Sequence, residues 1–131
     1  MILDASAVVA ILLREPEYLD LLEAIRTAPK VAIGAPTLVE SSMVVTARLG
    51  PHSRDLAATM MREGGIDVLP FSEDHSIVAV DAFLRFGKGR HRANLNYGDC
   101  MAYAVACLAD RPLLFLGEDF RLTDIKAARD A

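Results

Sequence analysis

Two acidic residues come at or shortly after the ends of apolar segments that are typical of buried β-strands. Asp4 ends the segment 1–4, and Asp119 follows the segment 112–116. In sheets whose strands alternate with helices, ligands bind beyond the carboxyl ends of the strands. Both carboxylates are therefore placed where a ligand site is expected. Each has a structural alternative, because Asp4 could cap the next helix and Asp119 could stabilise a turn.

Two further acidic residues, Glu40 and Asp99, lie on apolar faces of predicted helices, which we expect to pack in the core. The face of Glu40 contains Met43, Val44 and Ala47, and the face of Asp99 contains Ala102, Tyr103 and Ala106. An unpaired buried carboxylate is costly, so such groups are paired, protonated or bound to a cation. The structural alternatives are a buried Arg partner for Glu40 and a first-turn position, favoured by the helix dipole, for Asp99.

If these four carboxylates converge, the chemistry that they permit is narrow. They would repel one another and raise their own pKa values unless cations neutralised them. Oxygen ligands select Mg²⁺ or Mn²⁺ rather than zinc, and the three histidines do not have zinc-ligand spacing. One or two such ions can activate water and stabilise the leaving oxygen of a phosphodiester.

A basic segment precedes Asp99. Residues 85–92 hold four of the 14 Lys and Arg residues and no acid, although the net charge of the chain is −4. The acidic total argues against sequence-blind binding of nucleic acid, but cations gathered beside a metal site suit an enzyme that cleaves a polyanion. We expect Lys88, Arg90 and Arg92 to hold phosphates, the alternative being a solvated loop. Phe86 and Tyr97 could stack on bases, although core packing is the simpler expectation for both.

The elements that must position these residues alternate along the chain. Strands are expected over 1–4, 31–33, 66–69 and 112–116, and helices over 5–14, 36–49, 52–63, 73–86 and 98–109, with another beginning at Pro16 and a short one near the end. Residues 87–97 are expected to form a loop. This order predicts an α/β three-layer sandwich, a central parallel sheet of four to five short strands flanked by helices. A length of 131 residues and 53% hydrophobic residues suit one domain over 1–131.

Two cysteines indicate the compartment. Cys100 and Cys107 are seven residues apart on one predicted helix, so about 10 Å separates them, beyond the ~7 Å limit of a disulfide. Free thiols suit a reducing cytoplasm. We see no targeting segment and no apolar run of the ~20 residues that a membrane span needs, so we expect a cytoplasmic protein without a membrane partner.

Four stretches of the chain together resemble the PIN-domain ribonucleases of the VapC type, the toxins of bacterial toxin–antitoxin pairs. They are Met-Ile-Leu-Asp-Ala-Ser-Ala at 1–7, Pro-Thr-Leu-Val-Glu at 36–40, Leu-Asn-Tyr-Gly-Asp-Cys at 95–100, and Leu-Leu-Phe-Leu-Gly-Glu-Asp-Phe at 113–120. The resemblance spans nearly the whole chain, and four stretches in this order are far more specific than any one alone.

The resemblance implies a PIN-like fold with an acidic metal site. Its four acids are Asp4, Glu40, Asp99 and Asp119, of which Asp4 and Asp99 are the direct ligands. Ser6 falls where the family often carries a hydroxyl that orients a metal-bound water. Glu118 and Asp124 lie close enough in sequence to compete with Asp119 as the fourth acid.

The resemblance also implies an activity and partners. The activity is Mg²⁺- or Mn²⁺-dependent endonucleolytic cleavage of RNA, leaving a 5′-phosphate and a 3′-hydroxyl. The partners are a second copy of the chain and a cognate antitoxin whose tail occupies a groove near the site. Leu12, Leu13, Leu19 and Leu22 could line this groove or simply pack in the core.

Two other functions stay open at this point. A metal-dependent phosphatase would use Asp4 as nucleophile, but that chemistry usually needs a second acid two residues later, where this chain has Ser6. A PIN-like RNA-binding module without catalysis would be expected to have lost acids, yet all four acidic positions are filled.

Overall fold

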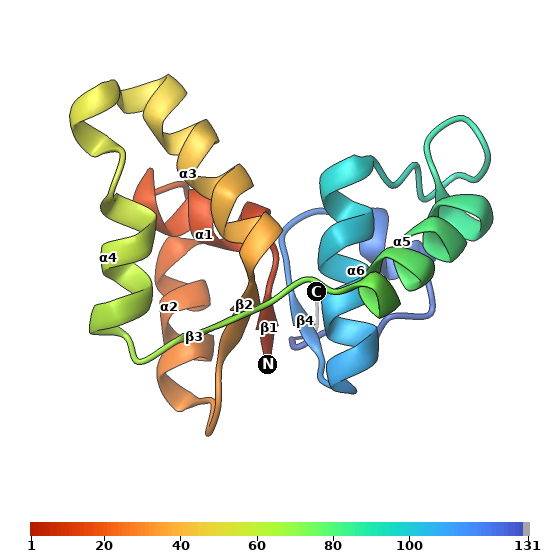
Figure 1. Cartoon of the computed structure of the whole chain (residues 1–131). Helices are drawn as coiled ribbons and strands as arrows, with labels where there is room; N and C mark the ends of the chain where they lie inside the picture. The colour runs from red at the N-terminus through yellow and green to blue at the C-terminus, as the bar shows by residue number, and fades with distance from the viewer. Residues whose placement is uncertain (130–131) are drawn as a thin grey trace.

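The computed structural model describes residues 1–129 and contains one parallel sheet (Figure 1). Its strands are β1 (Ile2–Leu3), β2 (Ala32–Gly34), β3 (Asp67–Leu69) and β4 (Leu113–Leu114), in the order β3-β2-β1-β4. All three neighbouring pairs are parallel. The predicted parallel sheet is confirmed, with four strands that are shorter than the apolar segments that predicted them.

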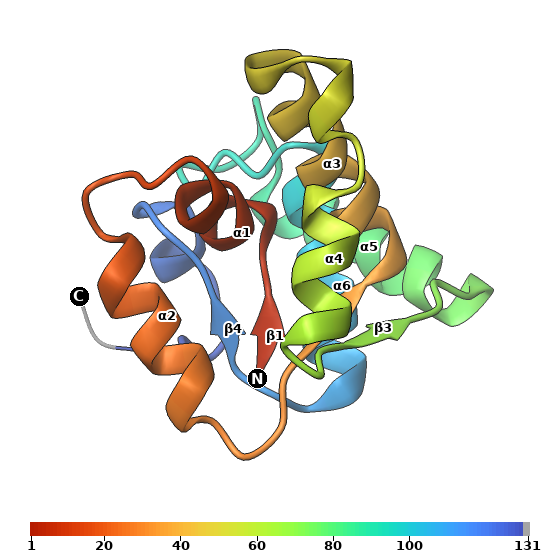
Figure 2. The ribbon, with the colours of Figure 1, turned by 90° about the vertical axis from the view of Figure 1, so that its left-hand side faces the viewer.

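Within the described residues 1–129, six α-helices flank the sheet in two layers (Figures 1 and 2). They are α1 (Ala5–Leu12), α2 (Tyr18–Thr27), α3 (Ala35–Leu49), α4 (Leu56–Glu63), α5 (Glu73–Phe86) and α6 (Tyr97–Ala109), with 3-10 turns η1 (Pro51–Ser53) and η2 (Asp119–Leu122). Figure 2 faces the layer that contains α1, α2 and α4, with α6 behind it. Pro16 lies before α2 rather than in its first turn, and the short terminal helix is the 3-10 turn η2.

Alternate strand residues divide the core between the two layers. Ile2, Ala32 and Leu113 are in register across the sheet and belong to the cluster beneath α5 and α6. The next residue of each strand, Leu3, Ile33 or Leu114, belongs to the cluster beneath α1, α2 and α4. Because successive side chains of a strand point to opposite faces, even these two- and three-residue strands hold both layers.

The carboxyl edge of the sheet is where the acidic residues gather. β1 leads directly into Asp4, β2 leads directly into α3, and β4 is followed by the loop that ends at η2. At the end of β2, a Cβ on Gly34 would lie 2.7 Å from Cγ2 of Val105, closer than packed atoms approach. Glycine at 34 therefore lets α6 pack closely over β2.

The cysteines and the length of the helices bear on two further expectations. Cys100 and Cys107 are both free thiols, the first buried and the second exposed. None of the helices described within residues 1–129 is long and apolar enough to cross a bilayer.

Candidate active site

Asp4 is a buried carboxylate at the end of β1, with only 4% of its surface exposed. Its Oδ2 accepts hydrogen bonds from the Ser6 backbone N–H at 3.1 Å and from the Ser6 hydroxyl at 2.6 Å, which caps α1. Ser6 Oγ in turn accepts from the Leu116 N–H at 3.0 Å. Asp4 is therefore the N-cap that the sequence allowed, and Ser6 ties it to the segment after β4.

The pKa of Asp4 is raised although Ser6 stabilises its charge. Burial is the largest cause, the hydrogen bonds from Ser6 oppose it, and the charge of Glu40 adds to the rise. No Lys, Arg or His side chain within residues 1–129 forms a salt bridge with Asp4. A buried carboxylate of this kind is stabilised by a proton or by a cation.

Asp99 lies in the first turn of α6 and shares a reciprocal cap with Asn96. The Asp99 N–H donates to Asn96 Oδ1 at 2.8 Å, and Asp99 Oδ2 accepts from the Asn96 N–H at 3.0 Å. Burial is the main cause that raises the pKa of Asp99 to about 6, and the charges of Asp4 and Asp119 contribute to the rise. The hydrogen bond from the Asn96 N–H acts in the opposite direction and lowers this pKa. The three side chains on its helical face are buried as predicted.

Glu40 comes from α3 and lies against the start of α6. A Cβ at Gly98 would lie 2.6 Å from Glu40 Oε2, so the carboxylate occupies space that only glycine leaves free. Burial and the charge of Asp99 raise the pKa of Glu40. We predicted that the helical face of Glu40 packs in the core. This prediction is wrong, because Met43 is 67% exposed and Val44 and Ala47 are also on the surface. The burial of Glu40 comes from α6 rather than from its own helix.

Glu118, Asp119 and Asp124 are the three candidates for the fourth acid of the predicted metal site. Asp124 is held elsewhere, because its carboxylate accepts hydrogen bonds from the Tyr103 hydroxyl at 2.6 Å and from Arg85 Nη2 at 2.8 Å. Glu118 and Asp119 are both exposed before and within η2. Of the three, Asp119 is the one whose charge raises the pKa of Asp99, which favours it as the fourth acid.

We call the four acids Asp4, Glu40, Asp99 and Asp119 the acidic cluster. They come from the end of β1, from α3, from α6 and from η2, respectively. The charge of Glu40 raises the pKa of Asp4, the charge of Asp99 raises the pKa of Glu40, and the charges of Asp4 and Asp119 raise the pKa of Asp99. As they stand, no three His, Cys, Asp or Glu side chains in the described range 1–129 converge closely enough to hold an ion. The chemistry of the donors fits a hard divalent cation, but their carboxylates would have to draw together to bind it. Their part in catalysis stays a prediction.

The basic loop, residues 87–92, begins where α5 ends and projects beyond α5 and α6 (Figure 1). Lys88, Arg90 and Arg92 are exposed. Arg90 lies over the ring of Phe83, 5.9 Å from its centre, and Nε donates to the Leu84 carbonyl at 3.4 Å. Arg85 is not part of this group, because Asp124 and Asp81 pair with it.

The two aromatic residues near this loop differ in their surroundings. Phe86 is half-buried and packs against the ring of Tyr103, with 6.1 Å between centroids, as the core interpretation predicted. Tyr97 is 82% exposed, so core packing is wrong for this residue. It is the first residue of α6.

Two residues of the site were not identified from the sequence. Gly98 makes room for Glu40, and Asn96 caps the helix that carries Asp99. Asn96 could have been identified from the sequence, because an N-cap residue followed three positions later by an acid, here Asp99, is a capping-box pattern.

The family model for the PIN domain matches residues 1–126. The chain belongs to the PIN-domain family. Among curated relatives, ribonuclease VapC36 of Mycobacterium tuberculosis is 45% identical over 127 residues, which cover 96% of this chain and 91% of the relative. Ribonuclease VapC of Mycolicibacterium smegmatis is 43% identical over 129 residues, 97% and 98% of the two chains. The VapC ribonuclease class predicted from the four stretches is confirmed.

Solved VapC structures share the fold. Mycobacterium tuberculosis VapC20, a toxin that cleaves the sarcin–ricin loop, superposes with a TM-score of 0.77 at 15% identity, over 95% of each chain. VapBC2 of Rickettsia felis, bound to a DNA fragment from its promoter, gives a TM-score of 0.73 at 15% identity, over 96% of this chain and 95% of the other. The predicted PIN-like sandwich is confirmed.

Proposed function

We propose that this VapC ribonuclease is a toxin that hydrolyses internal phosphodiester bonds of RNA with Mg²⁺ or Mn²⁺ held by the acidic cluster. The observation that carries the proposal is the set of three neighbouring carboxylates Asp4, Glu40 and Asp99, whose pKa values are all raised. No salt bridge within residues 1–129 neutralises them. A cluster of this kind is stabilised by divalent cations.

Each residue has a distinct part in this proposal. Asp4 and Asp99 hold the ion, while Glu40 and Asp119 complete its negative surroundings. The bound ion supplies activation of water and stabilisation of charge on the phosphodiester. Ser6 fixes the Asp4 carboxylate through its 2.6 Å hydrogen bond, and the cap with Asn96 fixes Asp99.

RNA is the proposed substrate, with its phosphates held by Lys88, Arg90 and Arg92. These three cations are exposed and lie on the loop that leads into α6, the helix that carries Asp99. Phosphate contacts position a nucleic acid without reading its sequence. The loop therefore supplies affinity, and the acidic cluster supplies the chemistry.

The deciding experiment is cleavage of end-labelled single-stranded and hairpin RNAs with Mg²⁺ or Mn²⁺, with and without EDTA. The proposal predicts products with 5′-phosphate and 3′-hydroxyl ends, lost with EDTA and in Asp4→Asn and Asp99→Asn. Asp124→Asn is the matched control, because Asp124 is paired elsewhere, and it should cleave. Cleavage that survives EDTA contradicts the proposal. Release of phosphate from small monoesters with intact RNA would identify the phosphatase instead, and RNA binding without cleavage would identify the inactive module.

The proposed antitoxin surface lies on α2 and its surroundings. Leu19 is 64% exposed and Leu22 is also exposed, so both side chains can contact a partner. Leu12 and Leu13 are partly buried, so they contribute less than predicted. An amphipathic segment of a partner can pack its apolar face against exposed apolar side chains of this kind. Leu22→Asp should therefore prevent co-purification with the protein encoded by a small open reading frame directly upstream, whereas Leu108→Asp on α6 should not.

A homodimer and a cytoplasmic location complete the proposal. Ile77, Val80 and Leu84 form an exposed apolar stripe along the outer side of α5, from 63% to 54% exposed. A continuous apolar stripe of this kind is typical of a protein interface, so we place the second copy there. The free thiols of Cys100 and Cys107 suit the reducing cytoplasm, and residues 1–131 are proposed as one domain.

A further inference from the structure

An apolar hollow of about 520 Å³ lies beside the acidic cluster, between α3 and the start of α6. Its volume is within the roughly 300–1,000 Å³ range of small-molecule sites. The residues that matter for its chemistry are Val39, Glu40, Met43, Asn96, Tyr97 and Met101. The hollow and the acidic cluster share Glu40, so a group bound in the hollow adjoins the proposed reaction centre.

The walls of this hollow suit an uncharged planar group. None of its lining residues is Lys or Arg, and the Glu40 carboxylate repels a phosphate. Most of the surface is apolar side chain, and the polar groups are few. Glu40 can accept a hydrogen bond from a base N–H, and the Asn96 amide nitrogen can donate to a base acceptor.

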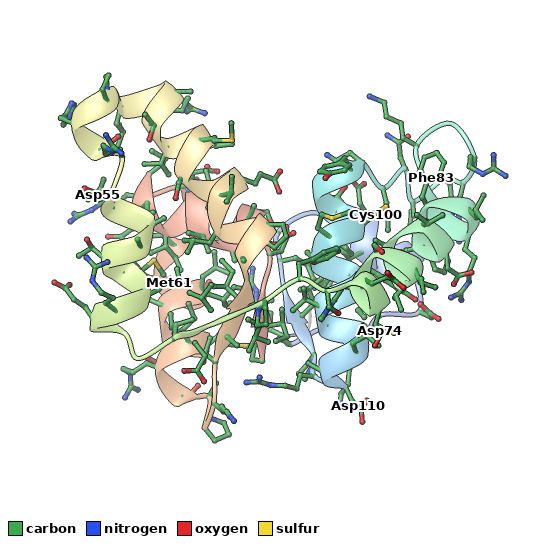
Figure 3. All side chains as sticks on the ribbon, viewed as in Figure 1. Asp55, Met61, Asp74, Phe83, Cys100 and Asp110 are labelled. Atoms are coloured by element: carbon green, nitrogen blue, oxygen red, sulfur yellow. The ribbon has the colours of Figure 1, made fainter. Side chains whose placement is uncertain are left out.

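Tyr97 is the aromatic residue among those that line this hollow. Its ring is 82% exposed and also lines a second apolar hollow of about 410 Å³, which includes Phe83 and Cys100. Figure 3 shows these two labelled residues on α5 and α6, on the far side of α6 from α3. Tyr97 thus lies between the two hollows. Being two residues before Asp99 on the same helix, it is held about 3 Å along the axis from that acid.

We propose that Tyr97 and the hollow between α3 and α6 form a nucleobase subsite, in which the base of a nucleotide adjoining the scissile phosphate stacks on the Tyr97 ring. This inference rests on the proposed RNA-cleaving function. Single-stranded RNA is recognised by stacking of bases on aromatic side chains and by hydrogen bonds to base edges. Stacking of the base would bring the adjoining phosphate to the acidic cluster, where the divalent cation proposed above would offset the repulsion from Glu40. The exposed cations of the basic loop, which precedes Tyr97 in the chain, would then contact the RNA backbone.

Cleavage kinetics test the subsite through Tyr97→Ala, Tyr97→Phe and the control Leu108→Ala, an exposed apolar residue of the same helix. Tyr97→Ala should raise KM by roughly 5- to 150-fold, the loss expected for one stacked base. Tyr97→Phe keeps the ring and should recover most of this loss, and Leu108→Ala should behave as wild type. Because stacking is uncharged, the salt dependence of kcat/KM should be the same in Tyr97→Ala and wild type.

A binding measurement separates this inference from the proposed function. Short single-stranded RNAs with one 2-aminopurine are titrated into each variant, and quenching of the fluorescent base reports stacking. Quenching by wild type and Tyr97→Phe but not by Tyr97→Ala supports the subsite, even if the RNA is not cleaved and the proposed function fails. Equal quenching and equal KM in wild type and Tyr97→Ala overturn it. A dimer that becomes a monomer in Tyr97→Ala, measured by light scattering, also overturns it, because a second copy would then cover the hollow.

Discussion

Glu40 occupies the space beside Gly98 that a β-carbon would fill, since a Cβ at residue 98 would lie 2.6 Å from Glu40 Oε2. The two residues come from α3 and α6, so this contact determines how closely one acid of the cluster approaches the helix that carries another. Glycine in a helix is otherwise unfavourable by about 1 kcal/mol relative to alanine. Any larger residue at position 98 would displace the Glu40 carboxylate.

Gly98→Ala should therefore lower the activity of the protein without lowering its stability. The added methyl group displaces Glu40, and we expect cleavage of RNA to fall about tenfold or more, a loss of roughly 1.4 kcal/mol in transition-state stabilisation. The melting temperature should stay the same or rise, because alanine favours the helix. Cys107→Ala, on the same helix and exposed, is the control. A Gly98→Ala variant with full activity would show that Glu40 need not lie where it does.

The stability of the metal-free protein should depend on pH through Asp99. Its pKa is raised from 3.8 to about 6 in the folded protein, so between these values the folded chain holds a proton that the unfolded chain releases. The stability that this proton contributes is present at low pH and is lost as the pH rises toward 6. In EDTA, Asp99→Asn should therefore melt at a higher temperature than wild type at about pH 7.5, and the difference should shrink near pH 4.5.

Asp124→Asn should change the melting temperature in the opposite direction to Asp99→Asn. Burial acts to raise the pKa of Asp124, but the bonds from Tyr103 and Arg85 hold it below its usual value. The stability that this carboxylate contributes is present above its ordinary pKa and is lost as the pH falls. Asp124→Asn should thus lower the melting temperature near neutral pH. If both variants shift it in the same direction, the electrostatic account of the cluster is wrong.

Neutralising the basic loop should weaken RNA binding and its salt dependence together. Each phosphate contact that is lost removes roughly 0.7–0.9 from the slope of log K against log salt, so the double variant Arg90→Gln, Arg92→Gln should reduce the slope by about 1–2. Titration of a labelled RNA at several salt concentrations measures it. Arg62→Gln, an exposed cation on α4, should leave the slope as it is. An unchanged slope in the double variant would refute phosphate binding by the loop.

Charge on the outer stripe of α5 should dissociate the proposed dimer. Ile77 and Val80 are 63% and 59% exposed, and a carboxylate buried between two copies is costly. Light scattering on Ile77→Glu, Val80→Glu should give the mass of a monomer, whereas Leu108→Glu should keep that of wild type. A wild-type monomer, or a double variant that remains dimeric, would exclude this face as the interface.

Much of the fold follows from local patterns in the sequence. The apolar segments ending near Asp4 and before Asp119 became β1 and β4, and the intervening helices made the sheet parallel. The partial burial of Asp99 was also predictable, because Ala102, Tyr103 and Ala106 recur on its face. In each case the spacing of apolar residues shows which side of a strand or helix is apolar, and in these elements that side faces the core.

Periodicity gives the wrong prediction of burial where the apolar side of a helix faces solvent. Met43 and Val44 continue the helical face of Glu40 but are exposed, and Tyr97 lies on the surface instead of in the core. Periodicity identifies an apolar face without identifying what covers it, so a surface for RNA or for a protein partner resembles a core face in sequence. The space at Gly98 depends on the distance between α3 and α6, which only the folded structure provides.

The central claim is that the acidic cluster binds a divalent cation, and titration of Mn²⁺ into the chelator-treated protein tests it most directly. Electron paramagnetic resonance counts the free ion, and wild type and Asp124→Asn should both bind Mn²⁺. Asp4→Asn and Asp99→Asn should bind it at least about tenfold more weakly, because each removes one of two charged ligands. Equal Mn²⁺ affinity in all four proteins, or no binding by wild type, would contradict the account.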